Sequence, residues 1–159
     1  MPDLERLTTV EPELRPIQLE GDSQAIGTAV VGWLGAGLTV RVVRGGKMKT
    51  LDGLFGEFAA AFQFPSYFGE NPDAFDECIA DLESLPADLG YVVVVTEPDL
   101  VLVDEPRWFA WFADSLASAT KRWGMSIELG EWWDRPAVPF HVVLAGEGSV
   151  VRAAARRWS

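Results

Sequence analysis

Residues 64–79 read Phe-Pro-Ser-Tyr-Phe-Gly-Glu-Asn-Pro-Asp-Ala-Phe-Asp-Glu-Cys-Ile and contain a strong start signal for a helix. Asn71 suits the N-cap, where its side chain can accept a backbone N–H of the first turn. Pro72 suits the first helical position, and Asp73 favours the positive end of the helix dipole. The stretch therefore predicts a loop that leads into a helix over residues 72–85, which the next proline ends.

This helix has one apolar face and one acidic face. At about 100° per residue, Ala74, Phe75, Cys78, Ile79 and Leu82 fall in one arc, and Asp73, Asp76, Glu77 and Asp81 fall in the opposite arc. Acids spaced three or four residues apart on a helix repel by roughly 0.2–0.5 kcal/mol per pair, and no Lys or Arg on the helix relieves them. The pattern fits a solvated acidic surface. It fits equally a surface whose repulsion a basic partner relieves.

Charge is distributed unevenly along the chain. The 159 residues include 24 acids and 13 bases, for a formal net charge of −11. The segment from residue 51 to residue 106 holds no Lys or Arg, and 13 of the acids lie there: Asp52, Glu57, Glu70, Asp73, Asp76, Glu77, Asp81, Glu83, Asp88, Glu97, Asp99, Asp104 and Glu105. This balance argues against direct binding of nucleic acid and against docking on an anionic membrane. It favours a cationic protein partner.

Outside this helix, strand and helix patterns alternate. We expect strands at 17–19, 38–43, 91–95 and 140–144, and helices at 24–34, 50–63, 106–123 and 149–158. This order predicts an α/β fold with a small, mainly parallel sheet flanked by helices and joined by right-handed crossovers. We expect residues 1–37 to be an N-terminal extension packed on or flanking the core. Residues 38–159 would form the main domain, with an insertion at about 126–138 and a C-terminal helix.

Residues 64–79 resemble the signature of the barstar family, the intracellular inhibitors of the ribonuclease barnase. The family shows a Pro, an aromatic pair, Gly-Glu-Asn, then Asp-Ala-Leu, with an acid and a Cys one turn later. The order of strands and helices extends the resemblance over residues 38–145. The resemblance implies that the signature helix and the preceding loop plug the active site of a basic ribonuclease, with carboxylates in place of RNA phosphates.

The resemblance also implies which residues bind the partner. Tyr67 matches the aromatic residue that packs on the enzyme, and Asp73 matches an inhibitory acid at the helix start. Glu77 stands where the family inhibitor has its central Asp, and Asp76 stands where it has a Trp, so the target is expected to be a ribonuclease or toxin other than barnase. The partner-binding residues that we expect are Tyr67, Phe68, Gly69, Asn71, Asp73, Asp76, Glu77 and Asp81. In this set Gly69 would let the loop approach the partner closely.

The remaining chemically notable residues offer little for catalysis. With one cysteine and one histidine, the chain cannot build a disulfide framework, a Cys/His metal site is nearly excluded, and no cofactor is expected. Cys78 is expected to be a buried thiol on the apolar face of its helix, and His141 a satisfied core histidine in a buried strand. Trp132 and Trp133 fit two roles equally, as anchors for a partner or as packed side chains.

An enzyme is the main rival class. Catalytic carboxylates need environments that separate their pKa values, whereas four acids on one exposed helix face share one solvated environment. There is no clear nucleophile–base pair either, so we expect no enzymatic activity.

We therefore expect a cytoplasmic inhibitor, an antitoxin or immunity protein, that binds a basic ribonuclease one to one. The cytoplasmic expectation rests on an N-terminus without a secretory signal and on apolar runs too short to span a bilayer. The alternative is a module of the same fold that binds another basic protein without inhibiting a ribonuclease.

Overall fold

Four parallel strands form one sheet in the order β1-β4-β3-β2. The protein is described by a computed structural model that covers residues 4–65, 67–82 and 84–158. The strands are β1 (Ile17–Glu20), β2 (Thr39–Arg44), β3 (Tyr91–Thr96) and β4 (Phe140–Gly146). This arrangement confirms the predicted α/β class with a parallel sheet.

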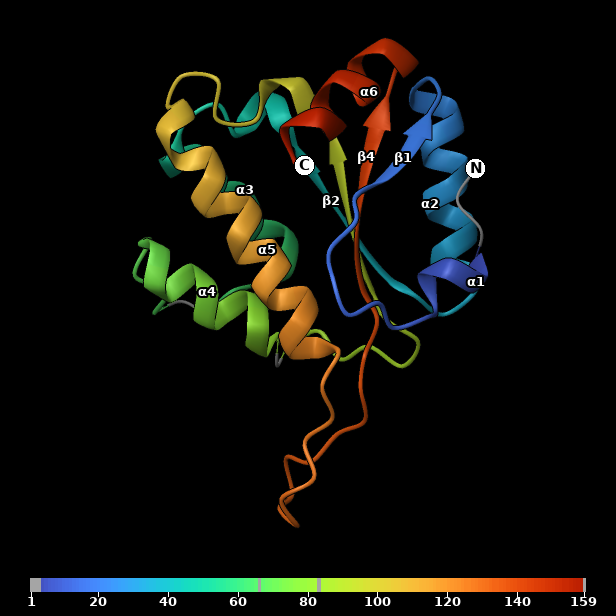
Figure 1. Ribbon diagram of the computed structural model, residues 1–159, viewed down its shortest axis with the longest axis vertical. Coiled ribbons are helices and arrows are strands. Elements are labelled where there is room, and N and C mark those ends of the chain that lie inside the picture. The colour runs from blue at the N-terminus through green and yellow to red at the C-terminus, as the bar shows by residue number, and fades with distance from the viewer. Residues whose placement is uncertain (1–3, 66, 83, 159) are drawn as a thin grey trace.

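Helices cover both faces of the sheet (Figure 1). They are α1 (Leu4–Leu7), α2 (Ser23–Gly35), α3 (Leu51–Phe62), α4 (Pro72–Asp81), α5 (Phe109–Trp123) and α6 (Gly148–Arg157), with short 3-10 turns at Gly45–Lys47, Pro98–Leu100 and Pro106–Trp108. Helices α3, α4 and α5 lie on one side, and α1 and α2 lie on the other. Among the described residues, no helix is long and apolar enough to cross a membrane.

Strand β3 is buried on both faces. Val93 and Val95 join the core beneath α3, α4 and α5, whereas Val92 and Val94 join the smaller core beneath α1 and α2. Such a strand has no solvent-facing side, and this explains why its sequence is an unbroken apolar run rather than an alternating one.

Aromatic packing fixes α4 to its neighbours. Phe75 is fully buried, and its ring contacts those of Phe55, Phe58, Phe64, Trp111 and Phe112 at centroid distances of 5.1 to 6.5 Å. The indole Nε1 of Trp123, at the end of α5, donates to the carbonyl of Ile79 at 3.0 Å. One face of α4 is thus held by α3 and α5, which leaves the opposite face to solvent.

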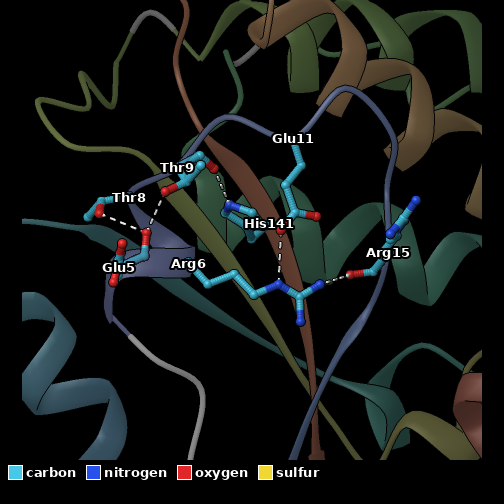
Figure 2. A network of polar contacts seen from close by, with 7 residues as sticks. All are labelled: Glu5, Arg6, Thr8, Thr9, Glu11, Arg15 and His141. Atoms are coloured by element: carbon cyan, nitrogen blue, oxygen red, sulfur yellow. Dashed lines mark hydrogen bonds and ion pairs between the residues drawn. The ribbon is translucent and has the colours of Figure 1, made fainter.

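The N-terminal segment is anchored to the sheet at two places. Strand β1 pairs with β4, and Nε2 of His141 donates to the carbonyl of Thr9 at 2.8 Å (Figure 2). His141 is 3% exposed, and burial lowers its pKa. The expectation of a satisfied core histidine is therefore confirmed, while the division of the chain at residue 37 stays a prediction.

Two details differ from the sequence predictions. Helix α4 ends at Asp81 rather than at residue 85, because Leu82 adopts a left-handed conformation (φ 43°) and its N–H bonds to the carbonyl of Cys78. The helix predicted at residues 106–123 begins with the 3-10 turn Pro106–Trp108, and its α-helical part starts at Phe109. The turn after β2 is a 3-10 turn that starts at Gly45. A Cβ on Gly45 would lie 1.9 Å from the carbonyl oxygen of Glu97, so only glycine fits there.

Candidate protein-binding site

The loop before α4 is organised by its own residues. The side chain of Asn71 accepts the N–H of Ala74 at 2.9 Å, which confirms the predicted N-cap. Its amide group also donates to the carbonyl of Gly69 at 3.3 Å. A Cβ on Gly69 would lie 2.9 Å from Nδ2 of Asn71. The small size of Gly69 therefore leaves room for the side chain of Asn71 in the cap. That Gly69 also lets the loop approach a partner closely stays a prediction.

Three carboxylates form the outer face of α4. Asp73, Glu77 and Asp81 are exposed, and none of them makes an ion pair within the part of the chain that the structure describes. The ion pairs found there lie elsewhere: Arg6–Glu11, Arg44–Glu57, Arg107–Glu105 and Arg152–Glu20. The face is therefore a row of free negative charges on a helix whose position is fixed by its buried side. We call Asp73, Glu77 and Asp81 the acidic face.

Asp76 does not belong to this face. Its side chain is half-buried, and its Oδ1 is enclosed without a hydrogen-bond partner among the described residues. The expectation of four acids in one solvated environment is thus wrong for Asp76. Asp76 lies at the boundary between the exposed face of α4 and the face that packs on neighbouring elements. A partner can therefore reach it less easily than it can reach Asp73, Glu77 and Asp81.

Tyr67 lies beside the acidic face. It is 83% exposed and lines a small hollow of about 120 Å³ together with Glu77, Cys78 and Asp81. The fold therefore brings together three of the predicted partner-binding residues, Tyr67, Glu77 and Asp81. Asp73 is exposed one turn earlier on the same helix and does not line this hollow.

Two further residues of the signature are turned at least partly inward. Phe68 is half-buried, with its ring edge-to-face against Phe55 at 5.7 Å and Phe64 at 5.1 Å. Its role in partner binding stays a prediction, and most of its ring serves the core. Cys78 is half-buried rather than fully buried. Burial raises the pKa of its thiol, and the neighbouring Asp81 and Glu77 raise it further, so it is a poor nucleophile at neutral pH.

The described residues hold no group of three or more His, Cys, Asp and Glu side chains that is arranged to bind a metal ion. The chemistry that the site does offer is recognition of positive charge. Exposed carboxylates on a rigid helix can accept charge-assisted hydrogen bonds from Arg, Lys or protonated His, and the exposed ring of Tyr67 can pack on an apolar or cationic group.

Comparisons with known proteins agree with this reading of the fold. No curated protein matches the sequence significantly. A solved structure of the Aeropyrum pernix ORC2 protein, in ADPNP-ADP complexes, is similar with a TM-score of 0.55 and 16% sequence identity. The alignment covers 96% of this chain and 40% of the ORC2 chain, and at that identity it shows a shared fold alone.

The family comparison is more specific. The model of the family described as Barstar (barnase inhibitor) matches residues 38–145. The match spans more than half of the 159 residues, including α4 and the loop before it. The chain therefore belongs to the Barstar family.

Proposed function

We propose that this protein inhibits a basic ribonuclease inside the cell, as an antitoxin or immunity protein, and binds the enzyme one to one. The observation that carries the proposal is the acidic face, three exposed carboxylates without ionic partners among the described residues, on a helix that the aromatic core holds in place. Membership of the Barstar family supports the class of target.

The mechanism follows from charge and rigidity. A ribonuclease binds RNA through cationic groups that face the phosphates. Asp73, Glu77 and Asp81 would take the positions of phosphate groups and accept hydrogen bonds from those cations. Because α4 is already ordered by Phe75 and Ile79, both almost fully buried, little conformational entropy is lost when the partner binds. Tyr67 would cover one side of the charged contact and exclude water from it.

An inhibition assay tests the proposal directly. A panel of purified basic ribonucleases, barnase among them, is assayed for RNA cleavage while the protein is titrated in. We expect the wild type to block one enzyme at a one-to-one ratio. Asp73→Ala with Glu77→Ala should weaken that complex by about 3–5 kcal/mol, because two cations of the enzyme then remain buried without partners.

The matched control removes two charges that follow the carboxyl ends of strands β2 and β4, away from α4. Asp52 lies at the start of α3, and Glu147 lies between β4 and α6; both are exposed. Asp52→Ala with Glu147→Ala changes the net charge by the same amount and should leave inhibition within a few-fold of wild type. If the Asp73/Glu77 variant inhibits as well as wild type, α4 is not the inhibitory site.

A second candidate is a binding module that has kept the fold without the inhibition. The half-buried Asp76 and the longer side chain at Glu77 favour it, because both depart from the residues that the family inhibitor carries at these positions. Such a module would bind a basic protein through α4 and leave RNA cleavage unchanged by every ribonuclease of the panel.

A further inference from the structure

The segment between α5 and β4 is an ordered projection. Residues 125–138, which we call the tryptophan loop, extend away from the sheet beyond the ends of the helices (Figure 1). Ile127 and Arg135 exchange two backbone hydrogen bonds of 2.8 and 3.1 Å. The carboxylate of Asp134 accepts the backbone N–H groups of Leu129 and Gly130 at 3.0 and 2.8 Å, and these bonds lower its pKa.

The base of the loop is held by Arg135. Its guanidinium donates to the carbonyls of Arg122, Trp123, Met125 and Pro136 at 3.0–3.2 Å. It also lies over the indole of Trp123, 4.4 Å from the ring centroid. One arginine thus satisfies a group of carbonyls that a projecting loop would otherwise leave to water, and the loop has a defined shape before any partner arrives.

This defined shape presents large apolar side chains to solvent. Trp132 is 86% exposed, Leu129 70%, Met125 57% and Trp133 47%. The two tryptophan rings contact each other edge-to-face at 5.5 Å, and none of these four residues packs into either hydrophobic core. They therefore add little to the stability of the fold. A rigid, exposed pair of tryptophans has the composition of a binding hot spot.

The tryptophan loop is continuous with the acidic face. Trp132, Trp133 and Ile127 line one wall of an open cleft of about 640 Å³, and Ala80 and Asp81, at the end of α4, line another. Asp81 also lines the hollow that contains Tyr67 and Glu77. A protein that covers Tyr67, Glu77 and Asp81 therefore reaches the edge of the tryptophan cleft without a gap.

The charges around the cleft decide what can cover it. The loop carries three acids, Glu128, Glu131 and Asp134, and the charged residues that line the cleft are Asp81, Arg122 and Arg135. Arg135 is used to hold the backbone, and the four acids outnumber the two bases. With Asp81 at the rim, an anionic membrane surface would be repelled. A second copy of this chain, at net charge −11, would bring two acidic surfaces together. The complementary surface is apolar and lies on a basic protein.

We propose that the tryptophan loop is a second docking point for the same basic ribonuclease that the acidic face binds, and that the cleft receives an apolar side chain from beside the cationic site of the enzyme. This inference rests on the proposed function. It adds a specificity element, because phosphate mimicry alone fits any basic ribonuclease, whereas the cleft fits one with an apolar group at the right distance.

The experiment measures the affinity of the inhibited ribonuclease for three variants of the full chain by calorimetric titration. Trp132→Ala with Trp133→Ala is expected to raise Kd on the order of 10- to 100-fold. Val31→Ala with Leu34→Ala removes apolar side chains that are 69% and 48% exposed on α2 and should leave Kd within a few-fold. Asp73→Ala with Glu77→Ala reports on the acidic face in the same assay. Unfolding midpoints confirm that each variant is folded.

A second arm needs no ribonuclease. The neutral dye Nile red should fluoresce with the wild type and lose most of that signal with the Trp132/Trp133 variant, because the cleft accepts apolar groups. Dye signal that is the same in both proteins overturns the cleft as an apolar site.

The outcomes distinguish the inference about the tryptophan loop from the proposed inhibition of a ribonuclease. Loss of affinity in both the acidic and the tryptophan variants supports the inference. Loss in the acidic variant alone overturns it and leaves the proposed function standing. If no ribonuclease of the panel binds the wild type, the proposed function fails, and the assignment of a ribonuclease as the occupant fails with it, whatever the dye shows.

Discussion

Helices α4 and α6 are each ten residues long, and each carries charge of a single sign. Two of the three arginines of α6 are used within the protein. Arg152 pairs with Glu20 of β1 at 2.9 Å, and Arg157 donates to the carbonyl of Val101 at 3.2 Å while its guanidinium lies 3.9 Å from the ring centroid of Phe109. The exposed acids of α4 have no such partners among the described residues.

The difference separates charge that takes part in the fold from charge that is left exposed to solvent. In α6, Arg152 and Arg157 secure the helix against β1 at the sheet edge and against Val101 and Phe109. In α4 the buried side chains of Phe75 and Ile79 hold the helix against the core. Its exposed acids are therefore not needed for that contact. Unrelieved repulsion on a helix that is fixed from its other side is what a surface built to meet positive charge requires.

The largest expected effect removes the support of α4. Phe75→Ala should lower the free energy of unfolding by about 3–5 kcal/mol, because it deletes a fully buried ring that contacts five other aromatic rings. Urea denaturation measures the change. A loss below about 1 kcal/mol would mean that α4 is held in another way.

Arg157→Ala is the matching test on α6. The protein should lose about 1–2 kcal/mol of stability, since the hydrogen bond to Val101 and the contact with Phe109 disappear together. Inhibition of the ribonuclease should not change. Weaker inhibition by a folded Arg157→Ala protein would contradict the separation of the two helices.

His141 is a buried titrating group, and it makes the stability of the fold depend on pH. Burial lowers the pKa of folded His141 below its ordinary value of 6.5, so the unfolded chain takes up the proton first as the pH falls. Stability should therefore decrease as the pH falls through about 6.5, which thermal unfolding at pH 7.5, 6.5 and 5.5 can follow. His141→Gln should flatten the slope in this window. An unchanged slope would assign the effect to other groups.

The smallest effect concerns the acidic face itself. Glu77→Gln should raise the free energy of unfolding by roughly 0.5 kcal/mol, because it removes repulsion with Asp73 and Asp81. The same substitution should weaken the ribonuclease complex. A protein that became less stable would show that Glu77 takes part in folding, and the contrast with α6 would then fail at this residue.

Local signals in the sequence predicted the parts of the site that depend on local interactions. The Asn71 cap and the start of α4 follow from three adjacent residues, and the strand at residues 91–95 follows from its unbroken apolar run. The parallel sheet followed from the order of the elements. These features need no knowledge of distant contacts.

Tertiary contacts determine the features that the sequence did not show. Helix α4 ends at Asp81 because Leu82 turns into the core with a left-handed backbone, where it is 5% exposed. Asp76 is half-buried because of what packs around the helix. The cleft between Asp81 and Trp132 joins residues about 50 positions apart. Trp132 and Trp133 are 86% and 47% exposed and do not pack in the core, while their role as anchors for a partner stays a proposal.

Competition for the RNA site tests the central claim most directly. A fluorescent single-stranded oligonucleotide is bound to a catalytically inactive form of the inhibited ribonuclease, and this protein is titrated in while anisotropy is recorded. If the acids of α4 replace phosphates, the protein displaces the oligonucleotide completely at one equivalent, and the Asp73→Ala/Glu77→Ala variant requires a large excess. A ternary complex, with oligonucleotide and protein bound together, would contradict the account.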